Sequence, residues 1–304
     1  MTGMGHFNMN IIDIHTHGIG GFDTRTSNPE DIIRMAEIQA SLGVSAIVPA
    51  IYPDKIEIMR QNMIAVKKAM EFQKSEGGTG SAGLHDRLKY AAILGVHLEG
   101  PFLNSAKCGA LKSSSFIEPK ESNLKKLIEG FEDMIKIITI APELNGAVKL
   151  IRKISDMGII ASMGHSDATY SEAEEGFNAG AKGITHIFNA MRGFHHREPG
   201  IVGFGLLNKD IFIEVIADPH HLNTKTLEII FRTKNPERII LISDSVKGTM
   251  ASKTEEEHGV VDNSGRLQGG AMSIMASSRR LTEMDFNEWI IINCITKNPE
   301  TYLS

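Results

Sequence analysis

The chain has 304 residues, of which 41% are hydrophobic and 23% charged, and its formal net charge is -5. This length can bury a large core in one domain, and the negative charge gives no electrostatic case for binding nucleic acid. Cys108 and Cys294, the two cysteines, lie far apart without CxxC spacing, so we expect neither a disulfide framework nor a cysteine zinc site. The first ten residues lack the pattern of a secretory signal, and no run approaches the roughly 20 apolar residues of a membrane span. The sequence therefore predicts a soluble cytoplasmic protein without a membrane or nucleic-acid partner.

Short apolar runs rich in β-branched residues alternate along the chain with segments of helical periodicity. Eight such runs are typical of buried parallel strands, and they cover residues 10–17, 45–51, 90–99, 135–143, 158–165, 183–190, 211–218 and 238–245. After the first run, a helix is expected with Asn28 as its N-cap, Pro29 in its first turn and Gly43 as its stop. The alternation predicts a (β/α)8 TIM-type barrel, with an eight-stranded open doubly wound sheet as the alternative.

Three further segments complete the expected fold. Residues 71–87 are polar and glycine-rich, which predicts an exposed loop. The turn signal "DNSG" predicts a small hairpin insertion around residues 258–270, and residues 283–296 are expected to form a last helix on the barrel's outer layer. We expect residues 1–304 to form a single catalytic barrel domain.

Histidines and acids gather where the predicted strands end, and in a barrel this end carries the active site. His15 and His17, which end the first strand, point to the same face because they are two residues apart. The other candidates are Glu99, His165, His186 and Asp244. A lone histidine on an apolar strand is more often structural, but six such groups at corresponding strand ends predict a metal site. Imidazole and carboxylate ligands suit one or two divalent ions, zinc first, with iron, manganese or nickel as alternatives.

Several motifs together resemble the N-acetylglucosamine-6-phosphate deacetylase family of the amidohydrolase superfamily. They are "HTH", "GVHLEGPFLN", "APE", "GHSDAT", "THIFNAM", "REPG", "IADPHHL" and "ISDS", and they occur in the family's order between about residues 11 and 275. "HLEGP" and "THIFNAM" are the most specific of them. The resemblance implies hydrolysis of the acetamide of a phosphorylated N-acetyl amino sugar, giving acetate and an amino-sugar phosphate.

The resemblance also implies a role for each matching residue. Glu99, His165 and His186 would hold the principal ion, and His15 and His17 a second one. Asp244 would act as catalytic base and then acid, with His221 near the substrate carbonyl. The implied substrate-binding residues are Ala110, Asn189, Ala190, Arg197, His221 and Gly269. Arg197 would clamp the phosphate, and because relatives supply this arginine from a neighbouring subunit, a homodimer is implied.

Three departures from the family pattern keep the substrate open. Leu111 stands where relatives carry a substrate-contacting histidine, and leucine makes no hydrogen bond. Lys247 follows the strand-eight aspartate in place of a small-residue turn, and most of the family's accessory β-sandwich is expected to be absent. The alternatives are therefore another amide, such as N-acetylgalactosamine 6-phosphate, an acetylated amino acid or a cyclic amide, or a catalytically silent sugar-phosphate-binding homologue. His97, two residues before Glu99, is expected to hydrogen-bond behind the ligands.

Overall fold

A computed structural model of the protein describes residues 10–76, 89–250 and 258–304. Within these residues, eight parallel strands pair side by side in chain order. They are β1 (Ile12–Thr16), β4 (Ala46–Ile51), β6 (Val96–Phe102), β7 (Ile135–Ile140), β8 (Ile160–Met163), β9 (Gly183–Ile184), β10 (Phe212–Ile216) and β11 (Ile239–Ile242). Thr16 forms a parallel bridge with Ser245, and His17 N–H donates to Ser245 O over 2.7 Å. These contacts join the end of the eighth strand to the first, and the predicted (β/α)8 barrel is confirmed.

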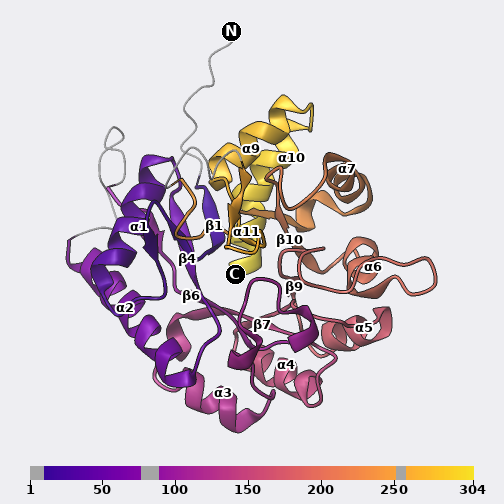
Figure 1. Cartoon of the computed structure of the whole chain (residues 1–304), viewed down its shortest axis with the longest axis horizontal. Coiled ribbons are helices and arrows are strands. Elements are labelled where there is room, and N and C mark those ends of the chain that lie inside the picture. The colour runs from indigo at the N-terminus through magenta and orange to yellow at the C-terminus, as the bar shows by residue number, and fades with distance from the viewer. Residues whose placement is uncertain (1–9, 77–88, 251–257) are drawn as a thin grey trace.

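Helices surround the strands on the outside (Figure 1). They are α1 (Pro29–Ser41), α2 (Ile56–Ser75), α3 (Glu121–Ile128), α4 (Ala147–Asp156), α5 (Tyr170–Asn178), α6 (Gly200–Leu207), α7 (Thr224–Thr233), α9 (Ile274–Glu283) and α10 (Glu288–Ile295). The last helix, α11 (Lys297–Leu303), lies within this ring, over the strands. The helix predicted after the first strand is confirmed, because the Asn28 side chain accepts from Glu30 N–H at the start of α1 and Gly43 has a φ of 94° after its end. No helix among the described residues is both long and apolar enough to cross a membrane.

Alternating side chains of the strands build two apolar layers. On β4, Ile47 and Ile51 belong to the layer between strands and helices, whereas Ala46 and Val48 belong to the smaller layer inside the barrel. Tyr302 of α11 joins the inner layer and packs on Phe212 at the start of β10, with 5.0 Å between ring centroids. The helix α11 therefore covers the amino ends of the strands, which leaves their carboxyl ends for the site.

The structure corrects three predicted elements. Residues 183–190 are a strand only over Gly183–Ile184, and the rest forms turns. The last helix does not span residues 283–296, because Asp285 has a φ of 63° and α10 begins only after its N-cap, Asn287. The expected loop at 71–87 begins later, since α2 extends to Ser75, and its residues 77–88 lie outside the described part of the chain.

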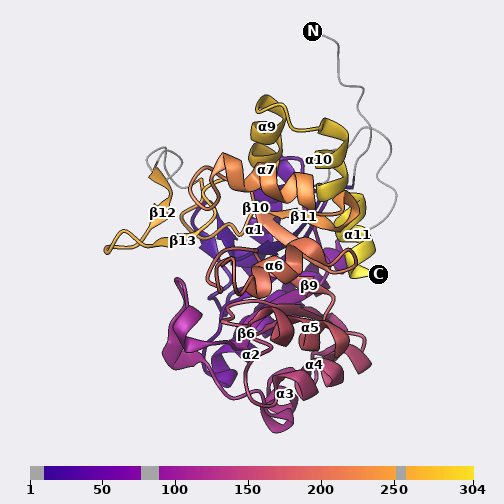
Figure 2. The same ribbon diagram turned by 90° about the vertical axis from the view of Figure 1, so that its right-hand side faces the viewer.

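Three short pairings complete the sheets. β2 (Gly18–Ile19) pairs antiparallel with β3 (Phe22–Asp23), and β5 (Ala92–Ile93) adds to β4. β12 (Val260–Val261) pairs antiparallel with β13 (Leu267–Gly269) around the "DNSG" turn. Figure 2 shows this hairpin projecting from the side of the barrel opposite α11, where the strands end.

Candidate active site

Three of the predicted site residues lie in left-handed turns just beyond strands. His165 follows β8 with a φ of 46°, His186 follows β9 with a φ of 31°, and Asp244 follows β11 with a φ of 47°. His186 is therefore not on the strand where the sequence placed it. The turns bring all three side chains to the carboxyl end of the barrel.

Glu99, His165 and His186 bring their ligand atoms to one point, and we call them the Glu-His-His trio. Glu99 Oε1 lies 3.1 Å from His165 Nε2 and 3.0 Å from His186 Nε2, and the two Nε2 atoms lie 3.1 Å apart. Each side chain is only 4% exposed. Three buried donor atoms at these separations could all contact one ion.

His15 and His17, the HxH pair, form a second group with Asp244. Their Nε2 atoms lie 3.2 Å apart, and Asp244 Oδ1 lies 3.4 Å from His15 Nε2 and 3.6 Å from His17 Nε2. Glu99 connects this group to the trio, because its Oε2 lies 3.2 Å from His17 Nε2. The six predicted groups therefore form one continuous cluster.

The hydrogen bonds of the histidine Nδ1 atoms show that the cluster fits a divalent cation. Three histidines have an oxygen acceptor at Nδ1: His15 has Glu214 Oε2 at 3.0 Å, His17 has Ala50 O at 2.9 Å and His165 has Lys107 O at 2.9 Å. A backbone carbonyl oxygen only accepts, so Nδ1 of His17 and His165 carries the proton, and the Nε2 of these neutral rings presents a lone pair. Neighbouring Nε2 lone pairs repel one another unless a cation or proton lies between them. Histidines that bind metals show this same arrangement.

Burial and neighbouring charge set the protonation of the acids. Burial raises the pKa of Asp244 well above its usual range, and the nearby carboxylates, Glu99 foremost, raise it further. Burial also raises the pKa of Glu99, but His17, His165 and His186 outweigh it and leave that pKa well below the usual value. Of the two, Asp244 is the acid better suited to hold a proton, whereas Glu99 stays ionised as a ligand should.

His221 is oriented by a buried carboxylate. Asp218 Oδ2 lies 2.9 Å from His221 Nδ1, and the backbone N–H of Ala271 also donates to Asp218. Burial raises the pKa of Asp218, but these hydrogen bonds and the charge of His221 lower it to about 2. The His221 Nδ1 therefore donates to Asp218, and Nε2 is the ring atom available to a ligand.

A cavity of about 390 Å³ opens over the cluster and collects most of the predicted substrate contacts. Ala110, Asn189, Ala190, His221 and Gly269 all line it. Arg197 does not line the cavity of its own chain. It is an exposed loop residue whose Nη1 lies 3.1 Å from His196 Nε2. Lys247 is also absent from the described lining, so no charge from it is placed there.

Leu111 and His97 lie on opposite sides of the ligand cluster. Leu111 lines the cavity but packs in a small apolar cluster with Tyr52, Leu103, Val246 and Val260. His97 is fully buried, and its Nε2 lies 2.7 Å from Thr139 Oγ1. The cavity wall at Leu111 is therefore apolar, and His97 supports the site from within the barrel.

Sequence reasoning missed several groups around the site. Tyr52 stacks on His17 with 3.8 Å between ring centroids, and Glu214 contacts His15 from inside the barrel. Arg266 and Gln268 of the hairpin also line the cavity. Tyr52 directly follows β4, so its place at a strand end was a usable signal. The other three come from contacts between distant parts of the chain, which spacing does not predict.

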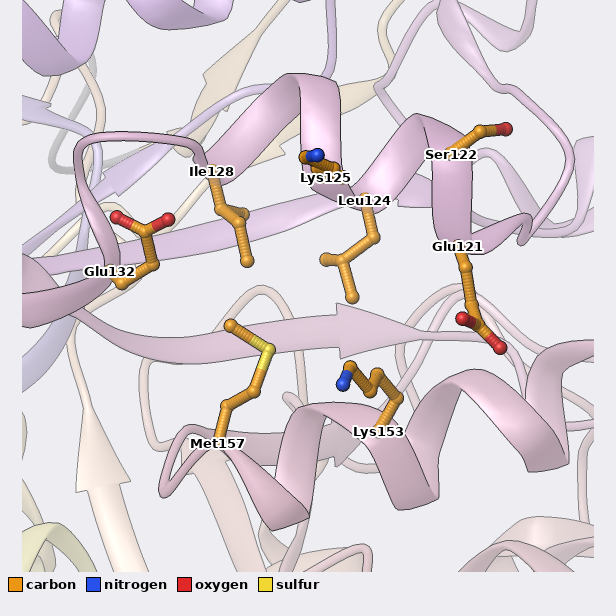
Figure 3. A pocket seen from close by; sticks show the side chains of 8 residues that line it. All are labelled: Glu121, Ser122, Leu124, Lys125, Ile128, Glu132, Lys153 and Met157. Carbon is orange, nitrogen blue, oxygen red and sulfur yellow. The ribbon is translucent and has the colours of Figure 1, made fainter.

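A second cavity lies on the outside of the barrel between α3 and α4. Figure 3 shows Leu124 and Ile128 of α3 pointing across it toward Lys153 and Met157 of α4 and its end. No histidine or cysteine lines this groove among the described residues. Its side chains offer no set of groups for catalysis, so the barrel mouth is the candidate active site.

The fold and the site together define a metal-dependent hydrolase of the amidohydrolase superfamily. Comparisons with known proteins are consistent with this class. The chain is 32% identical over 281 residues to N-acetylglucosamine-6-phosphate deacetylase of Vibrio furnissii, which covers 89% of this chain and 67% of that protein. It is 31% identical over 283 residues to N-acetylgalactosamine-6-phosphate deacetylase of Escherichia coli O157:H7, covering 90% and 71% of the two chains. The chain belongs to the N-acetylglucosamine-6-phosphate deacetylase family.

A solved structure supports the fold. The crystal structure of N-acetyl-D-glucosamine-6-phosphate deacetylase from Mycobacterium smegmatis superposes with a TM-score of 0.86 at 23% identity, over 97% of this chain and 78% of that one. No protein-family model matches the chain.

Proposed function

We propose that the protein hydrolyses the acetamide of N-acetylglucosamine 6-phosphate to give acetate and glucosamine 6-phosphate. The observation that carries this proposal is the Glu-His-His trio, converging within 3.1 Å beside Asp244 at the barrel mouth of a member of this family. The relative from Escherichia coli O157:H7 makes N-acetylgalactosamine 6-phosphate the second candidate substrate. The two sugars differ at one hydroxyl group, so the same amide chemistry would serve both.

The trio would hold the principal divalent ion, and the HxH pair a second one. Zinc suits this donor set first, with iron, manganese and nickel as alternatives. An ion bound there supplies a Lewis acid that polarises the amide carbonyl and makes water more acidic.

Asp244 and His221 would handle the protons of the reaction. The Asp244 carboxylate would accept a proton from the attacking water and then give it to the departing amine. Asp244 therefore acts as a base in the first step and as an acid in the second. His221 Nε2 would lie near the substrate carbonyl, because Asp218 engages Nδ1 and leaves Nε2 for the ligand.

The remaining predicted residues would bind the sugar phosphate. Ala110, Asn189, Ala190 and Gly269 line the cavity and would contact the sugar. Arg197, which lies outside its own cavity, would clamp the phosphate of a neighbouring subunit's substrate in a homodimer. We further propose that residues 1–304 act in the cytoplasm as one catalytic domain, with the hairpin at 258–270 as an insertion.

Acetate release from a panel of substrates tests the proposal. The panel contains the two N-acetyl amino-sugar phosphates, an acetylated amino acid and a cyclic amide. We expect turnover of N-acetylglucosamine 6-phosphate, and a loss of at least about 100-fold in kcat for Asp244→Asn with its metal retained. No turnover of either sugar phosphate would refute the proposal, and activity unaffected by Asp244→Asn would refute the role of that residue.

A further inference from the structure

Arg266 is a cationic side chain at the rim of the active-site cavity. It lies in the turn between β12 and β13, directly after Gly265, whose φ is 79°. Of the described residues that line the cavity, Arg266 alone is a lysine or arginine. The floor of the same cavity carries the carboxylates of Glu99 and Asp244. The carboxylates at the floor therefore repel a dianionic group, whereas the arginine at the rim attracts it.

The backbone and side chain of Arg266 are both held in place. Asp262 Oδ1 accepts from Arg266 N–H over 3.1 Å, and Asp262 N–H donates to Arg266 O over 2.9 Å. Arg266 Nη1 donates to Gly109 O over 3.0 Å, which fastens the hairpin to the segment that carries Ala110 and Leu111. The guanidinium is therefore directed across the cavity mouth.

The hydrogen bond to Gly109 leaves most of the guanidinium available. It uses one of five N–H donors. Beside the hydrogen bond from Ser264, the charge of Arg266 helps to lower the pKa of Asp262 in the same turn, but the guanidinium forms no direct ion pair with a carboxylate of the described residues. The cations nearby are engaged elsewhere: Lys107 and Arg192 both contact Asp167, and Arg25 lies over the Tyr52 ring at 3.6 Å. Of these cations, Arg266 therefore has N–H donors that are free to bind a ligand.

We propose that Arg266 binds the phosphate group of the substrate within its own chain. The proposal rests on the proposed function, because it assigns the anchor for the phosphate of that same substrate. A guanidinium presents paired N–H donors that match two phosphate oxygens. With this contact, the chain that carries the metal ligands also binds the phosphate. The contact from Arg197, in comparison, depends on a neighbouring subunit.

Kinetics with a phosphorylated and an unphosphorylated substrate test the proposal. We expect Arg266→Gln to raise KM for N-acetylglucosamine 6-phosphate about tenfold, the effect of one solvent-accessible charge-assisted contact. The same variant lowers kcat/KM for N-acetylglucosamine much less than for the phosphorylated sugar, because the neutral sugar has no phosphate and loses only the support that Arg266 gives to the cavity wall. Arg266→Lys keeps the charge but loses the paired donors, so its KM lies between that of the wild type and that of Arg266→Gln. Arg152→Gln, on the exposed face of α4, is the matched control.

A binding measurement separates this proposal from the proposed function. In the Asp244→Asn background, the Kd of N-acetylglucosamine 6-phosphate is measured by calorimetry with and without Arg266→Gln. If the wild type does not release acetate but the Kd still rises about tenfold, the function fails and the phosphate contact stands. Equal Kd values, no binding at all, or equal losses for the phosphorylated and neutral sugars would overturn the role of Arg266.

Discussion

Glu214 provides the sharpest test of how the HxH pair is prepared for a cation. Glu214→Gln keeps the size of the side chain but removes the carboxylate that lies 3.0 Å from His15 Nδ1. The amide oxygen of glutamine can still accept from His15 Nδ1, so the substitution removes the charge of the acceptor, and because His15 is 0% exposed no water compensates for that loss. A hydrogen bond to a charged group contributes about 1.5–3 kcal/mol, and removing such a partner from a metal ligand lowers metal affinity about 10- to 100-fold. We expect this loss for the ion at His15 and His17, with the affinity of the trio unchanged.

The stability of the metal-free protein should respond differently. Burial raises the pKa of Glu214 from 4.5 to about 7. Between pH 4.5 and about 7, the folded chain therefore binds more protons than the unfolded chain. The wild type loses stability as the pH rises through this range. Glu214→Gln has no such titration, so we expect it to gain stability relative to the wild type over the same window. A general folding defect would instead lower the stability of the variant at every pH.

Zinc titration of chelator-treated protein measures the expected loss. Bound zinc per chain is determined at a series of buffered free-zinc concentrations for the wild type and the variant. Glu174→Gln, on the exposed side of α5, is the matched control because it removes one carboxylate far from the ligands. Two ions of unchanged affinity in Glu214→Gln would refute the reasoning, and so would a wild type that takes up only one ion.

Three further predictions follow from single features of the structure. Removing metal with a chelator should abolish acetate release and lower Tm, and zinc should restore both, because the ion binds only the folded site; full activity without metal would contradict the assigned cluster. Ala190 has a φ of 50°, so Ala190→Gly should raise the free energy of unfolding by about 1 kcal/mol in urea titrations, and an unchanged value would show that the turn is not strained. Burial lowers the pKa of Lys234 to about 7, so the folded chain binds fewer protons than the unfolded chain above that pH, and the wild type should gain stability relative to Lys234→Met as pH rises from 7 toward 10.5. If the free energy of unfolding had the same pH dependence in the wild type and in Lys234→Met, the pKa of Lys234 would be ordinary. The acceptors Gly205 O and Asn208 O would then be what holds the ammonium charged.

The barrel and the ligand cluster could be predicted because both depend on local pattern. Buried parallel strands are continuous apolar runs, and the carboxyl ends of such strands meet at one end of a barrel. Glu99 on β6 and the HxH pair at the end of β1 were therefore placed together from spacing alone. The order of the strands needed no further information, because each pairs with the next along the chain.

The groups that the sequence did not reveal depend on contacts between distant segments. Arg266 reaches the cavity through a hydrogen bond to Gly109, 157 residues away, and Glu214 contacts His15 across 199 residues. Nothing in the local pattern around either residue differs from that of a surface arginine or a strand glutamate. The end of the 183–190 run was also missed, because "THIFNAM" is apolar enough for a strand although its backbone turns at His186.

Left-handed turns at His165, His186 and Asp244 place these three side chains at the carboxyl end of the barrel. This conformation costs roughly 1–2 kcal/mol per non-glycine residue, and it occurs after three different strands. Backbone hydrogen bonds hold the turns: Asn104 N–H donates to His165 O over 3.0 Å, Asn189 N–H donates to His186 O over 3.0 Å, and Asp244 N–H donates to His15 O over 3.0 Å. Strain of this kind persists where the surrounding structure enforces it, and it concentrates at functional sites. Because backbone hydrogen bonds to other parts of the chain hold the turns, the fold itself sets the positions of His165, His186 and Asp244.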